Sequence, residues 1–401
     1  MSDRNFLERL LDGAEVEWKT LGEIGQVRMC KRILKSQTSS DGDIPFYKIG
    51  TFGKKPDAYI SRSLFEEYKS KYSYPKIGDI LISASGTIGR AVIFDGEDSY
   101  FQDSNIVWIE NDESVVLNKF LFYFYQIANW DTSVGGTIQR LYNDNLRRLS
   151  IPIPCPDNPD RSLAIQAEIV RILDTFTELT AELTAELTAR KKQYHYYRDR
   201  LLRFEDGEVE WKTLGEVLHM RAGHHISANN IMQASSGDHI YPCFGGNGIR
   251  GFVTKNSHDG AHLLIGRQGA LCGNVQRTKG KFYATEHAVV VTAKDNINID
   301  WAFHMLTLMN LNQYASQSAQ PGLAVRKLEV LRIPIPLLTD QVRIASLLDK
   351  FDTLTTDLSQ GLPREIALRQ KQYEYYRDLL LTFPKSEELK AHLNTMEKPH
   401  E

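Results

Sequence analysis

A long amphipathic helix is the strongest pattern of apolar and polar positions in the chain. No glycine or proline occurs in residues 162–206, and good helix formers dominate there. Apolar side chains recur at spacings of four, three, four and four residues, at Ile172, Phe176, Leu179, Leu183 and Leu187. This spacing keeps one stripe turned toward a partner helix, and its second consecutive step of four is a stutter that locally unwinds a coiled coil.

A second helix repeats the end of the first. RQKQYEYYRDLLLTF at 369–383 matches RKKQYHYYRDRLLRF at 190–204 almost residue for residue. Gly361 and Pro363 should break or kink this second helical region, which we expect from about 340 to 383. The side chains predicted to pack along the helical seam are Phe176, Leu179, Leu183, Leu187, Tyr194, Tyr197 and Leu201 in the first helix and Phe351, Leu354, Tyr373 and Tyr376 in the second.

The repeat extends to the rest of the chain. VEWKTLGEI at 16–24 returns as VEWKTLGEV at 209–217, and SIPIP at 150–154 returns as RIPIP at 332–336. Spaced copies of this length indicate a tandem duplication. FLERLL at 6–11 resembles the ends of both helices, so the order is cyclic and the chain opens near one helix end.

Each block between the repeated frames mixes short β-prone runs with helical stretches. In the first block, runs such as DILISASG and SNIVWIEN alternate with turns, while 61–72 and the apolar 117–130 read as helices. We therefore predict two α+β domains, each with a largely antiparallel sheet. The alternate prolines of SIPIP favour an extended edge strand, after which Asp160 or Ser162 is expected to cap the helix.

These patterns predict six regions. They are an N-terminal segment completing the distal helical region (1–12), a first domain (13–157), a central helical spacer (158–206), a second domain (207–338), a distal helical spacer (339–384) and a polar tail (385–401).

Composition narrows the class of protein. No apolar run approaches the roughly 18 residues that a membrane helix needs, and the N-terminus lacks a signal-peptide core, so we expect a cytoplasmic protein with no membrane partner. The four cysteines are scattered, which favours reduced thiols over a zinc site, and no metal site is predicted.

Basic charge is concentrated in the two blocks. The net charge of the chain is −3. Between Arg28 and Arg90, however, there are twelve Lys or Arg and six Asp or Glu, and between His219 and Lys294 there are eight Lys or Arg and three Asp or Glu. This enrichment suits a pair of DNA-facing surfaces, although a chance fluctuation on solvated faces would look the same.

Polar side chains in turns are the candidates for contact with DNA. Arg favours guanine and Gln favours adenine in the major groove, and small hydroxyl residues suit phosphates and base edges. The candidates are Lys48, Ser83, Ser85, Thr87 and Arg90 in the first block and His224, His225, Asn247, Arg250, Arg267, Gln268, Arg277, Lys279 and Lys281 in the second.

Three short segments match catalytic or cofactor-binding motifs, but each match is weak evidence for such a site. Pro56-Asp57 with Glu67-Tyr68-Lys69 matches a nuclease pattern, but the segment around Glu67 reads as a helix, where positions i and i+2 do not share a face. FGGNG at 244–248 matches a methyltransferase motif whose usual companion, N-P-P-[FY], is missing. The G-x-G-x-x-G at 246–251 precedes FVTKNS, so a hairpin is favoured over a dinucleotide loop.

Together, the duplicated frame, the IPIP segments, the Q-x-x-I stretches (166–169 and 341–344) and the TAEL tetrapeptides resemble one family. The chain resembles the specificity (S) subunit of a type I restriction–modification enzyme, nearest the IC subfamily. The resemblance implies two target recognition domains separated by two long antiparallel helices, related by an approximate two-fold axis.

The resemblance also implies function and partners. Each domain would read one half of a split target on double-stranded DNA, two methylation (M) subunits would bind the helices, and two restriction (R) motor subunits would join them. This chain would do no chemistry and hold no cofactor: S-adenosylmethionine belongs to the methylation subunits, and ATP and Mg to the motor subunits. Two alternatives stay open, a self-contained methyltransferase or nuclease and a coiled-coil adaptor that does not bind DNA.

Overall fold

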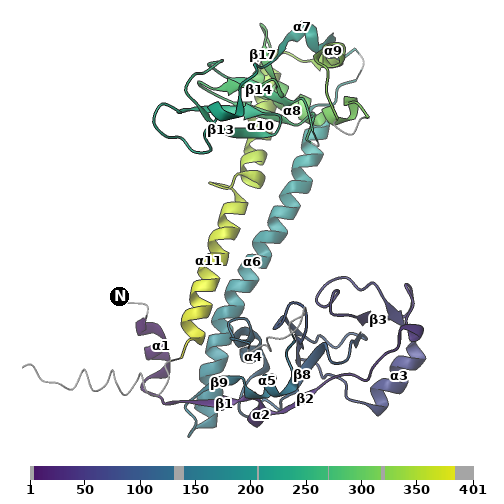
Figure 1. The fold of residues 1–401 in the computed structure, drawn as a ribbon, viewed down its shortest axis with the longest axis vertical. Helices are drawn as coiled ribbons and strands as arrows, with labels where there is room; N and C mark the ends of the chain where they lie inside the picture. Colours follow the sequence, from purple (N-terminus) through teal and green to yellow (C-terminus); the bar gives the residue numbers. More distant parts are fainter. Residues whose placement is uncertain (1–3, 131–139, 206, 270, 318–320, 384–401) are drawn as a thin grey trace, which may run out of the picture. The chain divides into compact units, whose positions relative to one another are not determined.

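The computed structural model describes residues 4–130, 140–205, 207–269, 271–317 and 321–383. The chain forms two compact units, which we call unit 1 (Met1–Glu182 and Ala367–Glu401) and unit 2 (Leu183–Ile366). The boundary between the units falls inside two long helices, α6 (Pro159–Leu201) and α11 (Leu362–Leu381), so each of these two contributes residues to both units. Figure 1 labels elements of both units. The predicted tail at 385–401 lies outside the described residues.

Unit 1 holds two sheets and a ribbon. A four-stranded antiparallel sheet has the order β2-β8-β5-β6, and a three-stranded sheet has the order β4-β3-β7, in which β3 and β7 run parallel. The strands are β1 (Val16–Thr20), β2 (Gln26–Arg28), β3 (Ile44–Tyr47), β4 (Tyr59–Ile60), β5 (Ile80–Ser83), β6 (Ala91–Ile93), β7 (Tyr100–Phe101), β8 (Ile106–Glu110) and β9 (Ser150–Pro154). The helices that precede the long one are α1 (Arg4–Leu11), α2 (Leu21–Ile24), η1 (Lys35–Gln37), α3 (Arg62–Lys71), α4 (Asn118–Tyr125) and α5 (Asn143–Arg148).

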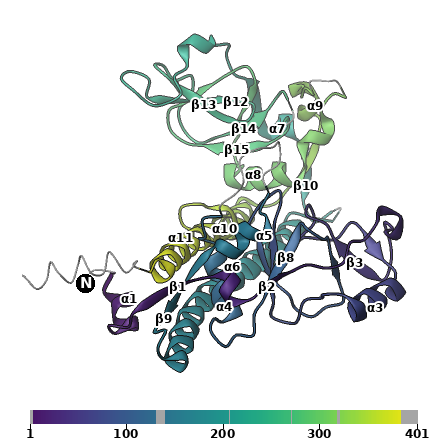
Figure 2. The same ribbon diagram turned by 60° about the horizontal axis from the view of Figure 1, so that its bottom comes forward.

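Unit 2 repeats this arrangement strand for strand. Its four-stranded sheet has the order β11-β17-β14-β15, and its three-stranded sheet has the order β13-β12-β16 with β12 and β16 parallel. Figure 2 labels β12 and β13 of the smaller sheet and β14 and β15 of the larger one. The strands are β10 (Glu210–Thr213), β11 (Leu218–Ala222), β12 (Tyr241–Gly245), β13 (Gly248–Val253), β14 (His262–Gly266), β15 (Val275–Thr278), β16 (Tyr283–Ala284), β17 (Ala288–Ala293) and β18 (Arg332–Ile335). The short helices are α7 (Leu214–Val217), η2 (Ala228–Asn230), α8 (Ile299–Leu308), η3 (Leu311–Tyr314) and α9 (Val325–Glu329). The predicted fold class, a duplicated α+β protein, is confirmed.

The repeated frame segments pair with each other. In unit 1, β1 from the VEWKT segment pairs antiparallel with β9 from SIPIP, with Val16 opposite Pro154 and Thr20 opposite Ser150. In unit 2, β10 pairs with β18 in the same way. Each ribbon has only two strands. The proline nitrogen, which has no hydrogen to donate, can therefore point away from the partner strand without loss of a hydrogen bond between the strands. The edge-strand prediction is therefore confirmed.

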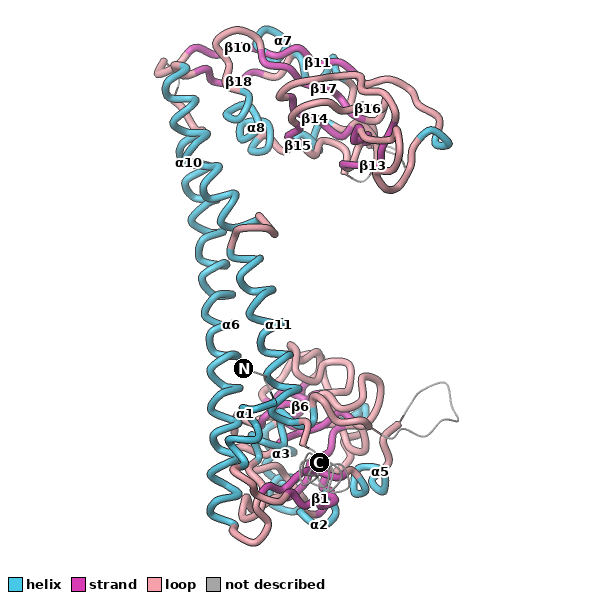
Figure 3. The backbone as a smooth tube through the Cα atoms, turned by 90° about the vertical axis from the view of Figure 1, so that its left-hand side faces the viewer, coloured by secondary structure: helices cyan, strands magenta, loops and turns pink. Residues whose placement is uncertain are grey.

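The long helices are α6 (Pro159–Leu201), α10 (Leu338–Thr356) and α11 (Leu362–Leu381). In unit 1, α6 and α11 lie side by side (Figure 3), and the ring of Phe176 stacks on Tyr376 with centroids 5.2 Å apart. In unit 2, α6 packs against α10, and Tyr197 stacks on Phe351 at 5.8 Å. Leu179, Leu183, Leu187 and Leu354 are half-buried along the same helices.

The predicted break in the second helix is also present. α10 ends at Thr356 and α11 begins at Leu362. A Cβ at Gly361 would lie 2.3 Å from the carbonyl oxygen of Thr353, so only glycine fits this close turn.

Two details of the helix predictions were wrong. α6 is capped by Asn158, whose Oδ1 accepts a hydrogen bond from the backbone N–H of Arg161 at 3.1 Å, and neither Asp160 nor Ser162 is the cap. Pro159 follows as the first helical residue, where its missing N–H costs nothing. The helix expected over 117–130 covers only Asn118–Tyr125, because the chain turns back and packs Trp130 on Tyr125 with ring centroids 5.4 Å apart.

The cap of α6 can be tested by substitution. We expect Asn158→Ala to lower the free energy of unfolding of unit 1 by about 1 kcal/mol, because an N–H at the helix start loses its acceptor. Asp160→Ala is the matched control and should cost only about 0.3–0.5 kcal/mol through the helix dipole. Denaturant unfolding of both variants measures this, and a larger loss for Asp160→Ala would contradict the assignment.

Candidate nucleic-acid interface

Several strand ends meet at one edge of the four-stranded sheet in unit 2. The register places Ala222 opposite Val289 and Gly266 opposite Ala288, so the end of β11, the end of β14 and the start of β17 lie together. β12 joins them through its parallel pairing with β16, where the Thr285 N–H donates to the Phe244 carbonyl at 2.9 Å. We call the loops 223–225, 245–248, 267–269 and 285–287 the unit 2 edge.

The unit 2 edge is held by short-range hydrogen bonds. The Arg267 N–H donates to the His287 carbonyl at 2.8 Å, and its guanidinium reaches the Glu286 carbonyl at 3.5 Å. His225 Nδ1 lies 2.9 Å from Glu286 Oε1. The side chain of Gln268 is exposed, and its backbone forms a bridge with Gly322. His225, which is far from Arg267 and Gln268 in sequence, is thus brought close to them.

The hairpin between β12 and β13 adds two further candidates to this edge. Asn247 and Arg250 are both exposed, and the Arg250 side chain lies over Gly245, where a Cβ would approach its Cδ to 2.6 Å. Gly246 packs under the Gln268 and His287 carbonyls. The G-x-G-x-x-G residues, 246–251, form the turn of this hairpin and the first part of strand β13, as the sequence indicated.

Unit 1 has an equivalent edge. We call the loops 29–31, 48–53, 84–90 and 102–105 the unit 1 edge; they follow or precede β2, β3, β5 and β8 as their counterparts do in unit 2. The Arg90 guanidinium donates to the Phe52 carbonyl at 2.9 Å, and the Ile49 N–H donates to Gln102 Oε1 at 3.0 Å. Lys48 forms an ion pair with Asp57 at 2.8 Å.

The hydroxyl candidates of unit 1 divide into two groups. Ser83 and Ser85 are buried: the Ser83 hydroxyl donates to the Thr87 carbonyl, and the Ser85 hydroxyl donates to Asn105 Oδ1 at 2.7 Å. These serines shape the loop from within. Thr87 is exposed at its tip and is the hydroxyl of this group that faces solvent.

Three basic candidates of unit 2 do not join its edge. Arg277 is ion-paired with Asp349 and lies over the Phe303 ring at 4.0 Å, against helix α8. Lys279 and Lys281 are exposed but follow the end of β15, where Thr278 lies opposite His262. That is the far end of β14 from Arg267.

Sequence reasoning missed the loop that precedes β8 and β17. It contributes Gln102 and Asn105 to the unit 1 edge and Glu286 and His287 to the unit 2 edge. The signal was present, because the aligned segments QDSNIVWIEN (102–111) and ATEHAVVVTA (284–293) share apolar positions and differ at the polar ones.

Histidines accumulate beside the unit 2 edge. The ring of His258 stacks on Phe282 at 5.2 Å and lies 6.4 Å from the ring of His224. Burial, with smaller contributions from His262 and His224, lowers the pKa of His258. Burial alone would raise the pKa of Glu286, but its hydrogen bond to His225 and the nearby His287 together lower it. Protonation of His258 is therefore disfavoured in the folded protein.

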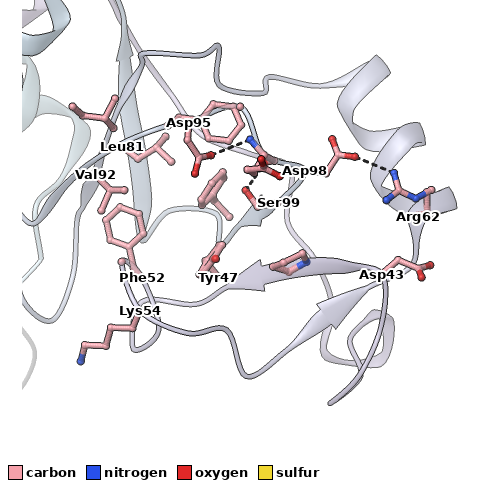
Figure 4. Close-up of a pocket in the computed structure, with 17 residues that line it drawn as sticks. Asp43, Tyr47, Phe52, Lys54, Arg62, Leu81, Val92, Asp95, Asp98 and Ser99 are labelled. Atoms are coloured by element: carbon pink, nitrogen blue, oxygen red, sulfur yellow. Dashed lines mark hydrogen bonds and ion pairs between the residues drawn. The ribbon is translucent and has the colours of Figure 1, made fainter. Parts of the chain in front are cut away.

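A hollow of about 630 Å³ in unit 1 is unsuited to DNA. Figure 4 shows Tyr47, Phe52 and Leu81 within it and carboxylates such as Asp95 and Asp98 around it. Of these carboxylates, Asp98 is paired with Arg62 at 2.9 Å. Clustered acidic groups repel phosphates, so we do not expect DNA to enter this hollow.

The nuclease look-alike does not form a site. Asp57 is paired with Lys48, whereas Glu67 lies on α3 and is paired with Lys71 at 2.9 Å. Among the described residues, no group of three or more His, Cys, Asp or Glu is arranged to hold a metal ion.

Comparison with known proteins decides the family. A family model described as the type I restriction modification DNA specificity domain matches residues 14–190 and again residues 207–368. The chain belongs to this family. It is the DNA specificity subunit of a type I restriction–modification system and is itself non-catalytic.

Similar proteins cover almost the whole specificity subunit. It is 50% identical over 375 residues, 90% of this chain and 93% of the other, to the type I restriction enzyme EcoprrI specificity subunit of Escherichia coli. A second type I specificity subunit of Escherichia coli is 38% identical over 411 aligned residues, 96% and 99% of the two chains. The crystal structure of an S subunit from M. genitalium, 15% identical, shares the fold with a TM-score of 0.60 over 93% of this chain and 98% of that one.

In the described part of the specificity subunit, no helix is long and apolar enough to span a membrane.

The histidine cluster predicts a pH dependence of stability. Because the folded-state pKa of His258 is lowered, the unfolded chain takes up its proton first, so stability is full above about pH 6.5 and falls as the pH drops below it. We expect the melting temperature to fall between pH 7.5 and 5.5. His258→Phe, which keeps the stacking on Phe282, should show a smaller fall. Equal pH dependence of the two proteins would show that His258 does not contribute.

Proposed function

We propose that this specificity subunit reads a bipartite target on double-stranded DNA, with the unit 1 edge on one half-site and the unit 2 edge on the other. The subunit thereby directs adenine methylation and DNA cleavage by partner subunits. The observation that carries the proposal is the duplicated topology: two sheets with the same strand order end in equivalent loops that bear different polar side chains. Two such edges on one chain are suited to two different short sequences.

The chemistry of each edge supports direct reading of bases. In unit 2, Arg267 and Gln268 follow a buried strand, and Arg and Gln suit the major-groove edges of guanine and adenine. His225, Asn247 and Arg250 surround them. In unit 1 the corresponding positions are Ala84 and Ser85, because the Ala84 N–H donates to the Asn105 carbonyl as the Arg267 N–H donates to the His287 carbonyl. Thr87 and Arg90 lie further along the same loop, so the two edges differ in hydrogen-bonding pattern.

The partners follow from the family and from charge. Two methylation subunits would bind the helices and carry S-adenosylmethionine, and two restriction subunits would carry ATP and Mg; the assembly would work in the cytoplasm. The net charge of −3 supports a role for partner subunits in DNA binding, because phosphate contacts drive most DNA affinity and this chain has 48 Lys and Arg against 51 Asp and Glu. The TAEL repeats support our proposal that the chain is nearest the IC subfamily.

The experiment that tests the proposal is methylome sequencing of cells that carry this chain and its partner subunits. It would return both half-sites, their spacing and the modified base. A single undivided target, or modification independent of this chain, would contradict the proposal.

Substitutions at one edge should alter one half-site. We expect Arg267→Ala with Gln268→Ala to relax recognition of the half-site read by unit 2 by about 1–3 kcal/mol per lost base contact while recognition of the other half-site stays unchanged. Arg364→Ala, an exposed arginine of α11, is the matched control for loss of charge. Methylation rates on duplexes with single base changes measure the effect, and uniform weakening across both half-sites would indicate a phosphate contact instead.

The tetrapeptide repeats should set the spacing between half-sites. Deleting 184–187, one TAEL unit, removes about 6 Å of helix and rotates the rest of the helix by about 40°, close to the twist of one base pair. We expect the number of unread base pairs to change while both half-sites are retained. Methylome sequencing of the deletion strain measures this, and the old spacing in that strain would refute the role of the repeat.

A further inference from the structure

A buried glutamine on the long helix fastens it to the domain in unit 1. The side chain of Gln166 on α6 has no solvent exposure. Its Oε1 accepts from the Leu117 N–H at 2.9 Å, and its Nε2 donates to the Val115 carbonyl at 3.0 Å and to the Ser162 hydroxyl at 3.2 Å. Gln166 therefore satisfies the backbone of the loop that leads into α4.

The same attachment occurs in unit 2. Gln341 on α10 is also without solvent exposure. Its Oε1 accepts from the Asn298 N–H at 2.9 Å, and its Nε2 donates to the carbonyls of Asn296 at 3.2 Å and Pro336 at 2.9 Å. In both units, therefore, a buried glutamine uses its Oε1 and Nε2 atoms to form hydrogen bonds with the backbone of the loop that precedes α4 or α8.

An aspartate eight residues further along each helix makes a second attachment. Asp174 accepts from Tyr123 Oη and from Lys119 Nζ, each at 2.7 Å, both on α4. Asp349 lies 2.8 Å from His304 Nε2 on α8 and is paired with Arg277 of β15.

Tyr123 and His304 occupy the same position, six residues after the N–H that each glutamine binds. The partner of the aspartate has changed between the two units, but the contact between helix and domain has been kept.

We call Gln166 with Asp174 the unit 1 clamp and Gln341 with Asp349 the unit 2 clamp. Eight residues of helix span about 12 Å, so each clamp holds its domain at two separated points. Apolar contacts alone tolerate sliding and rocking, whereas hydrogen bonds to fixed backbone groups are directional. Two directional points on one helix therefore oppose a tilt of the domain on that helix.

We infer that the two clamps are positioning devices that set the spacing between half-sites which the subunit accepts. This inference rests on the function proposed above. Each edge lies on the domain that its clamp holds, and α6 contributes residues to both units. A domain free to tilt would move its edge along the DNA, where one base pair is only about 3.4 Å. The clamps do not touch bases, so they act on distance and leave base preference alone.

The test uses the full chain assembled with its methylation subunits. Methylation rates are measured on duplexes with both half-sites and a spacer of the natural length, one base pair longer or one shorter. The clamp variants are Gln166→Leu, Asp174→Asn, Gln341→Leu and Asp349→Asn. Ile169→Val and Ile344→Val are the matched controls, since both residues are buried on the same helices without polar side-chain contacts.

We expect the preference for the natural spacer to fall at least about tenfold in Gln166→Leu and Gln341→Leu, because each variant loses all three hydrogen bonds of the glutamine side chain and one buried bond accounts for roughly that factor. Discrimination between half-site sequences should stay unchanged. Asp174→Asn keeps an acceptor for Tyr123 and should retain more of the spacer preference than Gln166→Leu. Asp174 is partly exposed, so this variant also gives a result if Gln166→Leu does not fold.

The inference is overturned if clamp variants lose melting temperature as the isoleucine controls do but keep the spacer preference of the unmodified chain. It is also overturned if half-site discrimination falls together with spacer preference, because the glutamines would then only maintain the fold. A complex of the unmodified chain that methylates no bipartite duplex would instead overturn the proposed function, and the inference with it.

Discussion

The larger hydrophobic core of each unit is completed by side chains of the long helices. Ile165, Ile169 and Leu173 of α6 are buried in the core of unit 1, together with Leu380 and Leu381 of α11. In unit 2 the core takes Leu202 beyond the end of α6 and Ile344, Ala345 and Leu348 from α10. Neither four-stranded sheet could bury its apolar face without these helices, so the helices and these sheets fold as one cooperative structure within each unit.

This dependence explains why polar groups are tolerated at the same boundary. A buried amide costs free energy unless every donor and acceptor is satisfied, and Gln166 and Gln341 are satisfied by loops of their own domains. A wrong docking of helix on domain would leave these groups unpaired. The apolar stripe thus supplies the affinity between helix and domain, and the polar contacts select one arrangement.

At the two edges, in contrast to the contacts between helix and domain, the polar side chains differ between the units. The frames of the edges are rigid, with backbone bridges such as that between Arg267 and His287, while the side chains at the tips of the loops differ between units. In unit 1 the Arg90 guanidinium donates a hydrogen bond to the Phe52 carbonyl, whereas in unit 2 the side chain of Arg250 is exposed. A constant scaffold with variable tips allows recognition to change without loss of the fold.

The duplication, the α+β class and the break at Gly361 could be predicted from the sequence alone, as could the helical positions of Phe176 and Tyr197. These features are local or repeated, so periodicity and residue type report them directly. Which candidates share an edge depends on the tertiary structure. The fold brings Arg267 and His225 together with Glu286, whereas Arg277 lies against Asp349. That choice depends on strand order and loop geometry between residues distant in sequence, which no local pattern encodes.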